Sequence, residues 1–186
     1  MLVIGLKGFA CNANPLFKGE AILKILVVSD IHYPDRRADI PDLSSFIEKS
    51  DLIFATGDFT CAEVLDYLKS FKKQVVAVHG NADDPFLKTT LPENLTVEVK
   101  NVKIGLYHGS GTPIRIASRV KNIFDCQLDA YIFGHTHIPL NKLINGKLFF
   151  NPGTISGFRS SLGMLYIDSG NIRGEIIRLS SHIMGV

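Results

Sequence analysis

KILVVSDIH (residues 24–32) starts as a run of apolar, mostly branched residues and ends in an aspartate and a histidine. The apolar part is typical of a strand buried inside a sheet. Because the polar residues follow at once, they are expected at the end of that strand. Three further runs share the apolar pattern: DLIFAT (51–56), QVVAVH (74–79) and DAYIFG (129–134). The sequence therefore predicts buried strands that lead directly into polar, chemically active side chains.

Helical spacing is found between and beyond these strands. Pro41 suits the first turn of a helix, where its missing N–H would have no partner. Thr60 and Glu63 have the spacing of a capping box, which predicts the start of a second helix. Apolar residues recur at helical intervals in each segment. We expect helices at about 41–49, 61–73 and 113–124.

Antiparallel pairs are expected in the second half of the chain. Polar and apolar residues alternate at 95–99 and 102–108, and hairpin signals occur at Asn145-Gly146 and at 169–171. The chain thus begins as βαβαβ and finishes with antiparallel meanders. This order predicts an α/β fold, built either as one mixed sheet or as two sheets packed face to face with helices outside.

The length of 186 residues fits one domain with a well-buried core. We expect that domain to span residues 23–186, and residues 1–22 to be an N-terminal extension, because the strand pattern opens at Lys24. The formal net charge of +2 argues against a nucleic-acid partner. The sequence has no uninterrupted apolar run of about 18 residues, so a membrane span is not expected.

Three cysteines, Cys11, Cys61 and Cys126, are widely spaced and form no CxxC motif. An odd number of isolated cysteines is typical of reduced thiols in the cytoplasm rather than of a disulfide framework. The apolar run near the N-terminus is broken at Lys7 and has no basic lead-in, which is unlike a secretory signal. We therefore predict a cytoplasmic protein.

Side chains that can bind metal ions follow the predicted strands. Each strand leads into a carboxylate, an imidazole or a carboxamide, and the glycines beside them allow tight turns. In an open α/β sheet, ligands bind beyond the carboxyl ends of the strands, so five such ends would surround one crevice. The residues concerned are Asp30, His32, Asp58, Asn81, Asp83, His108, His135 and His137.

This set of side chains suits a pair of divalent cations. Two ions about 4 Å apart need a bridging carboxylate, with nitrogen and oxygen donors on each side. The donors suit Mn²⁺ best, with Ni²⁺, Fe²⁺, Zn²⁺ or Co²⁺ as alternatives, and the lack of thiolates argues against a structural zinc site. Such a pair lowers the pKa of a bridging water towards neutrality and neutralises phosphate oxygens. Each motif alone is more often a cap, a turn or a surface pair, and only their coincidence predicts a metal centre.

Five short motifs, taken in order, resemble the calcineurin-type metallophosphoesterases, and most closely their small bacterial and archaeal phosphodiesterase branch. They are DIH (30–32), GD (57–58), GNAD (80–83), HG (108–109) and GHTH (134–137). The resemblance runs from Lys24 to about Leu179 and includes NPGTISGFR (151–159), which is similar to the Asn-Pro-Gly loop of that branch. It implies a four-layer α-β-β-α sandwich, in which helices flank two mixed β-sheets.

The resemblance also implies how the ligands divide between two metal ions. The first ion would take Asp30, His32 and His137. The second would take Asn81, His108 and His135. Asp58 would bridge the two ions, and a hydroxide that also bridges them would attack the phosphate.

Further roles are predicted around these ligands. Asp58, Asn81 and Asp83 are the predicted catalytic residues, and Asp83 is expected to orient a metal-bound histidine. Phosphate contacts are predicted for Asn81, His108 and Arg159, since a guanidinium can bind a phosphate through two N–H groups.

Ala82 departs from the family pattern. Many phosphatases of the superfamily have a histidine at this position, which is thought to protonate the leaving group, and alanine cannot do so. Loss of a general acid slows reactions with poor leaving groups by about 10²–10⁴-fold. The departure favours a phosphodiesterase that acts on small or nucleotide-like esters over a protein phosphatase.

Three alternatives stay open: a catalytically weak interaction scaffold of the retromer small-subunit type, a phosphomonoesterase, and a nuclease of the same superfamily. All seven ligand-type residues are kept, which counts against a pure scaffold. The small size and near-neutral charge count against a nuclease. The expected partner is a small-molecule phosphate ester, with no membrane partner, and homo-oligomer formation is left open.

Overall fold

The computed structural model describes residues 15–16 and 21–179. The predicted N-terminal extension, 1–22, therefore lies outside the described residues except at 15–16 and 21–22. Pro15–Leu16 form β1, which pairs in parallel with Glu98–Val99 at the edge of a sheet. Within the described ranges, no helix has both the length and the apolar character needed to cross a membrane.

The strands form two mixed sheets, as predicted from the resemblance. The 5-stranded sheet has the order β11 (Asn171–Arg178), β10 (Ser161–Asp168), β2 (Leu23–Val28), β3 (Leu52–Ala55) and β4 (Gln74–Ala77). The 6-stranded sheet has the order β1, β5 (Asn94–Val99), β6 (Val102–Tyr107), β7 (Ala130–Ile132), β9 (Lys147–Asn151) and β8 (Leu140–Ile144). Each sheet combines parallel and antiparallel pairs.

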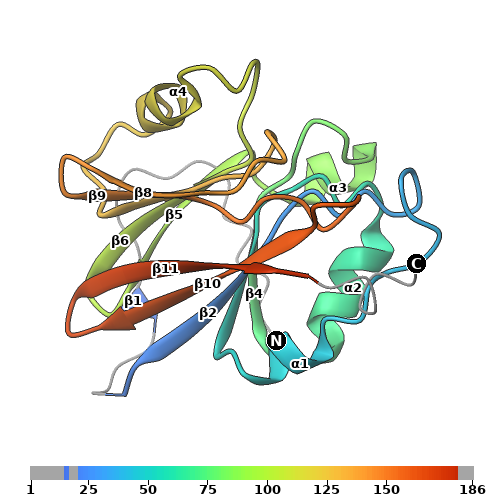
Figure 1. The fold of residues 1–186 in the computed structure, drawn as a ribbon, viewed down its shortest axis with the longest axis horizontal. Coiled ribbons are helices and arrows are strands. Elements are labelled where there is room, and N and C mark those ends of the chain that lie inside the picture. The colour runs from blue at the N-terminus through green and yellow to red at the C-terminus, as the bar shows by residue number, and fades with distance from the viewer. Residues whose placement is uncertain (1–14, 17–20, 180–186) are drawn as a thin grey trace.

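Apolar side chains fill three layers of core around and between these sheets. Neighbouring residues of one strand point to opposite faces, so Ile25 packs between the sheets while Leu26 packs beneath helices. The outer face of the 5-stranded sheet is covered by α1 (Ser44–Glu48), α2 (Ala62–Ser70) and α3 (Pro85–Thr90). On the other outer face, Val120 of α4 (Ile116–Asn122) packs with Tyr131 and Phe149. The four-layer α-β-β-α sandwich is thereby confirmed (Figure 1).

The parallel strands of each sheet determine where the site lies. In the 5-stranded sheet, Val28 of β2 pairs with Ala55 of β3, and Ala55 pairs with Ala77 of β4. The last residues of these three strands are therefore aligned. In the other sheet, β6, β7 and β9 run parallel in the same way. The loops that follow the strands leave each sheet at a common end.

The helices differ from the sequence prediction in detail. The predicted capping box is wrong, because α2 begins at Ala62 with Cys61 as its N-cap, and Thr60 has a left-handed φ of 75°. The Thr60 hydroxyl instead donates to the carbonyl of Tyr33, a tertiary contact that the local pattern cannot reveal. The third helix of this face, α3, was not predicted, although Asp84 caps it by accepting the Leu87 N–H at 2.7 Å.

The cysteines also differ from the prediction. Cys61 is a free thiol, as expected, but Cys126 is disulfide-bonded. The prediction of reduced thiols is wrong for Cys126, because widely spaced cysteines leave no spacing motif from which a pair can be recognised. A cytoplasmic location stays a prediction, and a disulfide counts against the reducing environment on which it partly rested.

Candidate metal centre

The loops after the two sets of parallel strands meet at one end of the sandwich. The N–H of Asp30 donates to the Gly57 carbonyl at 3.1 Å, and the N–H of His32 donates to the Asp58 carbonyl at 3.0 Å. These bonds continue the pairing of β2 and β3 beyond the strands themselves. From the second sheet, Gly134 N–H donates to the His108 carbonyl at 2.9 Å. The backbone therefore fixes each pair of loops before any side chain is considered.

The backbone at the predicted ligands is unusual. Asp30, His32, Asp58, His135 and His137 all have left-handed φ angles, at 55°, 53°, 54°, 68° and 57°. Residues other than glycine seldom adopt this conformation, and such residues gather at functional sites. Asn81 and His108 are not among the residues with a positive φ. Five of the seven predicted metal ligands thus have a backbone conformation that the surrounding structure must impose.

One group of ligand atoms joins the two sheets. His137 Nε2 lies 3.1 Å from Asp30 Oδ1 and 3.2 Å from His32 Nε2. His32 Nε2 lies 3.8 Å from the same Asp30 oxygen. These three atoms form a compact triangle that can hold a metal ion. The three residues are those predicted for the first ion.

Asp58 lies between this group and His108. Its Oδ2 atom is 3.7 Å from His32 Nε2 and 3.3 Å from His108 Nε2. Asp30, Asp58 and His108 form a second cluster of ligand atoms, all of them buried. A carboxylate between two groups of imidazoles is in the position that a bridging ligand requires.

Asn81 and His135 face each other beside this second cluster. His135 Nδ1 lies 2.9 Å from Asn81 Oδ1, and His135 Nε2 lies 2.8 Å from the Gly111 carbonyl oxygen. Both partners are oxygens that only accept, and a neutral ring carries one hydrogen, so the tautomer that could bind a metal through Nδ1 is the one with its hydrogen on Nε2. His135 Nδ1 and Asn81 Oδ1 are then both acceptors, and a cation between them would satisfy both.

Buried atoms without partners test whether metal ions fit. Among the residues that the structure describes, three buried side-chain atoms have no hydrogen-bond partner, and two of them, Asp30 Oδ1 and His108 Nε2, belong to predicted ligands, while the third is Thr56 Oγ1. His108 Nδ1 donates to the Thr56 carbonyl at 2.6 Å, which leaves the Nε2 lone pair of the neutral ring directed towards Asp58. Buried polar atoms are seldom left without partners. The donors are nitrogen and oxygen, so the cluster fits divalent ions such as Mn²⁺.

The ionisable groups perturb one another. Burial lowers the pKa of His32, against the opposing charge of Asp58. Burial would also lower the pKa of His108, but the nearby carboxylates of Asp58 and Asp30 favour the protonated ring, outweigh burial and raise the pKa. For Asp58, burial favours the neutral acid, yet its interactions with His108 and with the Ala82 N–H prevail and lower the pKa. The field around Asp58 therefore keeps it ionised, as a metal ligand must be.

Asp83 lies behind the cluster and is 2% exposed. Its carboxylate accepts the backbone N–H groups of Asp58, Thr60 and Gly80, at 3.1, 2.8 and 2.7 Å. We expected it to orient a histidine, but these bonds go to the backbone of two ligand-bearing loops instead. Asp83 thus fixes the loop that carries Asp58 against the loop that carries Asn81.

Glycines allow the loops to approach closely. A Cβ atom at Gly80 would collide with the Asp58 carboxylate, and one at Gly134 would collide with the Ser29 hydroxyl. The Ser29 hydroxyl itself donates to Asp30 Oδ2 at 2.6 Å, and the N–H of His135 donates to the same oxygen at 3.0 Å. The GN and GH motifs therefore need glycine for space.

Asn151 and Thr154 extend the site beyond the predicted ligands. Asn151 Nδ2 donates to the Gly134 carbonyl at 2.7 Å, and the Thr154 hydroxyl donates to the Asp30 carbonyl at 2.7 Å. Both belong to the Asn-Pro-Gly loop, so its position in sequence was the only signal for them. Arg159 lies on the same loop but is exposed, and its carbonyl accepts from Arg178 Nη1 at 3.2 Å. A phosphate contact by Arg159 stays a prediction.

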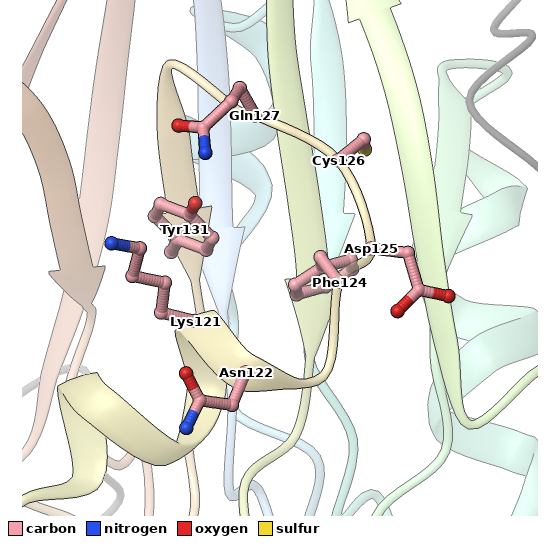
Figure 2. Close-up of a pocket in the computed structure, with 7 residues that line it drawn as sticks. All are labelled: Lys121, Asn122, Phe124, Asp125, Cys126, Gln127 and Tyr131. Atoms are coloured by element: carbon pink, nitrogen blue, oxygen red, sulfur yellow. The ribbon is translucent and has the colours of Figure 1, made fainter.

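A pocket of about 280 Å³ lies at the end of α4, away from the predicted ligands (Figure 2). Its lining consists of Lys121, Asn122, Phe124, Asp125, Cys126, Gln127 and Tyr131. The metal-type clusters described above share no residue with this lining. The candidate site is therefore the centre at the strand ends.

Two mixed sheets that bring aspartates and histidines together at their strand ends define the fold and site class of the metallophosphoesterases. The chain belongs to the calcineurin-like phosphoesterase superfamily, whose domain model matches residues 23–169. A probable metallophosphoesterase of Methanothermobacter thermautotrophicus is 30% identical over 162 residues, which cover 84% of this chain and 93% of that protein. The family predicted from the five motifs is thereby confirmed.

Two solved structures have the same fold. A Thermotoga maritima protein solved by NMR has a TM-score of 0.69 and 33% identity, over 84% of this chain and 99% of that one. Wild-type Vps29 of Entamoeba histolytica, complexed with Zn²⁺, has a TM-score of 0.65 and 26% identity, over 84% of this chain and 99% of that one. The chain is therefore similar both to a probable metallophosphoesterase and to a Vps29 solved with Zn²⁺.

Proposed function

We propose that the protein is a metal-dependent phosphodiesterase that hydrolyses small or nucleotide-like phosphate esters at a two-metal centre. The observation that carries this proposal is the position of Asp58, whose Oδ2 lies 3.7 Å from His32 Nε2 and 3.3 Å from His108 Nε2. A carboxylate in that position would serve both ions. The unpartnered atoms Asp30 Oδ1 and His108 Nε2 support the same assignment.

The first ion would be held by Asp30, His32 and His137, and the second by Asn81, His108 and His135. When bound, two divalent ions supply Lewis acidity to a phosphate oxygen and lower the pKa of water towards neutrality. We propose Mn²⁺ as the ion, because the donors are carboxylate, carboxamide and imidazole.

The surrounding residues would orient the substrate and the ligands. Asn81 is exposed, so its side-chain N–H₂ can bind a phosphate oxygen while its Oδ1 faces His135. Asp83 would act on the reaction only through the backbone of Asp58 and Gly80. Because Ala82 supplies no acid, the substrate must have a leaving group that departs without a proton from that position. A diester with a good leaving group meets this condition.

Hydrolysis of a nitrophenyl diester tests the proposal. We expect the metal-free protein to be inactive and Mn²⁺ to restore turnover, which a chelator then removes. The diester should be cleaved faster than the matching nitrophenyl monoester, and the reverse order would favour a phosphomonoesterase. Absence of turnover with Mn²⁺, Ni²⁺, Co²⁺, Fe²⁺ and Zn²⁺ would contradict the enzymatic proposal.

An interaction scaffold is the second candidate function. The similarity to Vps29 of Entamoeba histolytica, which was solved with Zn²⁺, favours this candidate. A scaffold of this kind would bind metal at the centre without hydrolysing an ester. The two candidates make opposite predictions for one sample. A protein that binds metal at the centre but fails to cleave the diester would support the scaffold.

Replacing Ala82 by histidine should restore acid catalysis. The N–H of Ala82 donates to Asp58 Oδ1 at 2.7 Å, so a side chain at this position starts beside the centre. We expect the variant to gain up to about 10²-fold in kcat/KM on diesters with poor leaving groups and little on nitrophenyl esters. The measurement is the slope of log kcat/KM against leaving-group pKa, which should become shallower. Ala82→Gln, which adds bulk without an acid, is the control, and equal slopes for the two variants would contradict the argument.

A further inference from the structure

We infer that Arg119 is a positioning residue for the second metal ion, and this inference rests on the two-metal centre proposed above. Arg119 lies on α4, a helix on the outside of the sandwich, and belongs to none of the five motifs. Its side chain reaches back across the loop that follows His108. Through that loop it fixes the ring of His135.

The guanidinium of Arg119 binds three carbonyls of one short loop. Nε and Nη2 donate to the Ser110 carbonyl at 3.2 and 2.9 Å, and Nη1 donates to the Ile114 carbonyl at 2.6 Å. Nη2 also donates to the carbonyl of Thr112. The planar guanidinium directs its donors at fixed angles, which suits it to hold several carbonyls at once. The loop from Ser110 to Ile114 is thereby closed around one side chain.

The same loop contacts His135 at two points. His135 Nε2 lies 2.8 Å from the Gly111 carbonyl oxygen, to which it donates in the tautomer that leaves Nδ1 free for a metal. Gly109 packs so closely that an added Cβ would lie 3.0 Å from His135 Cβ. Gly111 has a left-handed φ of 73°. In the sequence it stands between Ser110 and Thr112, and Arg119 binds the carbonyls of both of these neighbours. Arg119 therefore determines where the acceptor for His135 Nε2 is found.

That acceptor decides which ring nitrogen can bind a metal. With its hydrogen on Nε2, the neutral His135 ring has a free lone pair on Nδ1, which faces Asn81 Oδ1 at 2.9 Å. Without a fixed Gly111 carbonyl, the ring loses its tautomer and its orientation together. A hydrogen-bond partner behind a metal-bound histidine commonly contributes about 10–100-fold in metal affinity. In this protein, Arg119 supports that partner from outside the centre.

An alternative is that Arg119 only secures the start of α4. If that were its role, replacing Arg119 would lower the stability of the whole fold, because Val120 of the same helix is part of the core. The affinity for both ions would then fall alike. The positioning role instead acts on one ion. Asp30, His32 and His137 have no described bond to the 110–114 loop, so the first ion should keep its affinity.

Equilibrium dialysis of the full chain against Mn²⁺ with elemental analysis separates the two roles. We expect two ions per wild-type chain. In Arg119→Ala, the affinity for one ion should fall about 10–100-fold while that for the other is unchanged. Arg119→Lys, which keeps the charge but has fewer directed donors, should recover part of the loss. Lys121→Ala removes an exposed cation from the same helix and should bind both ions as the wild type does.

Two results would overturn the inference while leaving the proposed function intact. One is that Arg119→Ala binds both ions with wild-type affinity. The other is that it weakens both ions equally and lowers the melting temperature of the metal-free protein. A wild type that binds a single ion would overturn the two-metal centre and this inference together. Diester turnover is not needed for any of these measurements.

Discussion

Asp58→Asn is expected to lower kcat/KM for a nitrophenyl diester by at least about 10³-fold, because stabilisation by the metal pair is worth several kcal/mol. Asparagine keeps the size of the side chain and its Oδ1, which accepts the Ala82 N–H at 2.7 Å. It removes the charged oxygen that lies 3.3 Å from His108 Nε2 and 3.7 Å from His32 Nε2. A neutral carboxamide cannot balance two divalent charges, so the variant should also lose at least one of its ions.

The measurement combines steady-state kinetics over a range of Mn²⁺ concentrations with metal analysis of the same sample. Asp66→Asn is the matched control, because Asp66 is exposed on α2 and is not one of the predicted site residues. It should have wild-type kinetics. If Asp58→Asn retained near-normal turnover with both ions bound, another residue would have to be the bridge.

Metal binding should also stabilise the fold strongly. In the metal-free protein, the carboxylates of Asp30 and Asp58 lie within one buried cluster, at 0% and 3% exposure. Ions that bind only the folded chain add about 2.7 kcal/mol each when their concentration is 100 times the Kd. For a domain of this size, each kcal/mol raises the Tm by roughly 2–4 °C. One ion should therefore raise the Tm by about 5–11 °C, and a second ion should add to it.

Differential scanning calorimetry of chelator-treated protein, with and without Mn²⁺, measures this shift. The Asp30→Asn variant should lose most of it, since Asp30 Oδ1 is the unpartnered atom that lies 3.1 Å from His137 Nε2. Its metal-free form should be at least as stable as the wild type, because one buried charge is gone. A wild-type Tm that stays constant in millimolar Mn²⁺ would mean that the cluster is a structural ion-pair network rather than a metal centre.

The sequence predicted the centre because each ligand follows an apolar strand at once. A polar residue such as Asp30 or Asp58 directly after an apolar strand can be recognised from the sequence alone. The parallel order of β2, β3 and β4 then brings the ends of the strands together. The two sheets followed from the order of helical and alternating segments, but the choice between one mixed sheet and two needed the resemblance.

The contacts of residues that act through the backbone could not be predicted from the sequence. Asp83 lies within a motif, yet the three N–H groups that it accepts belong to loops that meet only in the folded chain. Arg119 reads in sequence as one more cation on an amphipathic helix. The Thr60 capping box failed for the same reason, because a tertiary contact with Tyr33 outweighed a local preference.

The left-handed conformation of five predicted ligand residues has a consequence for metal binding at the proposed centre. Each such residue costs about 1–3 kcal/mol, which the packed loops around it have already supplied when the chain folds. An arriving ion would therefore meet ligand residues whose backbone already has the left-handed conformation. Binding of an ion at the proposed centre would then order little further backbone, so little conformational entropy would be lost when the metal binds.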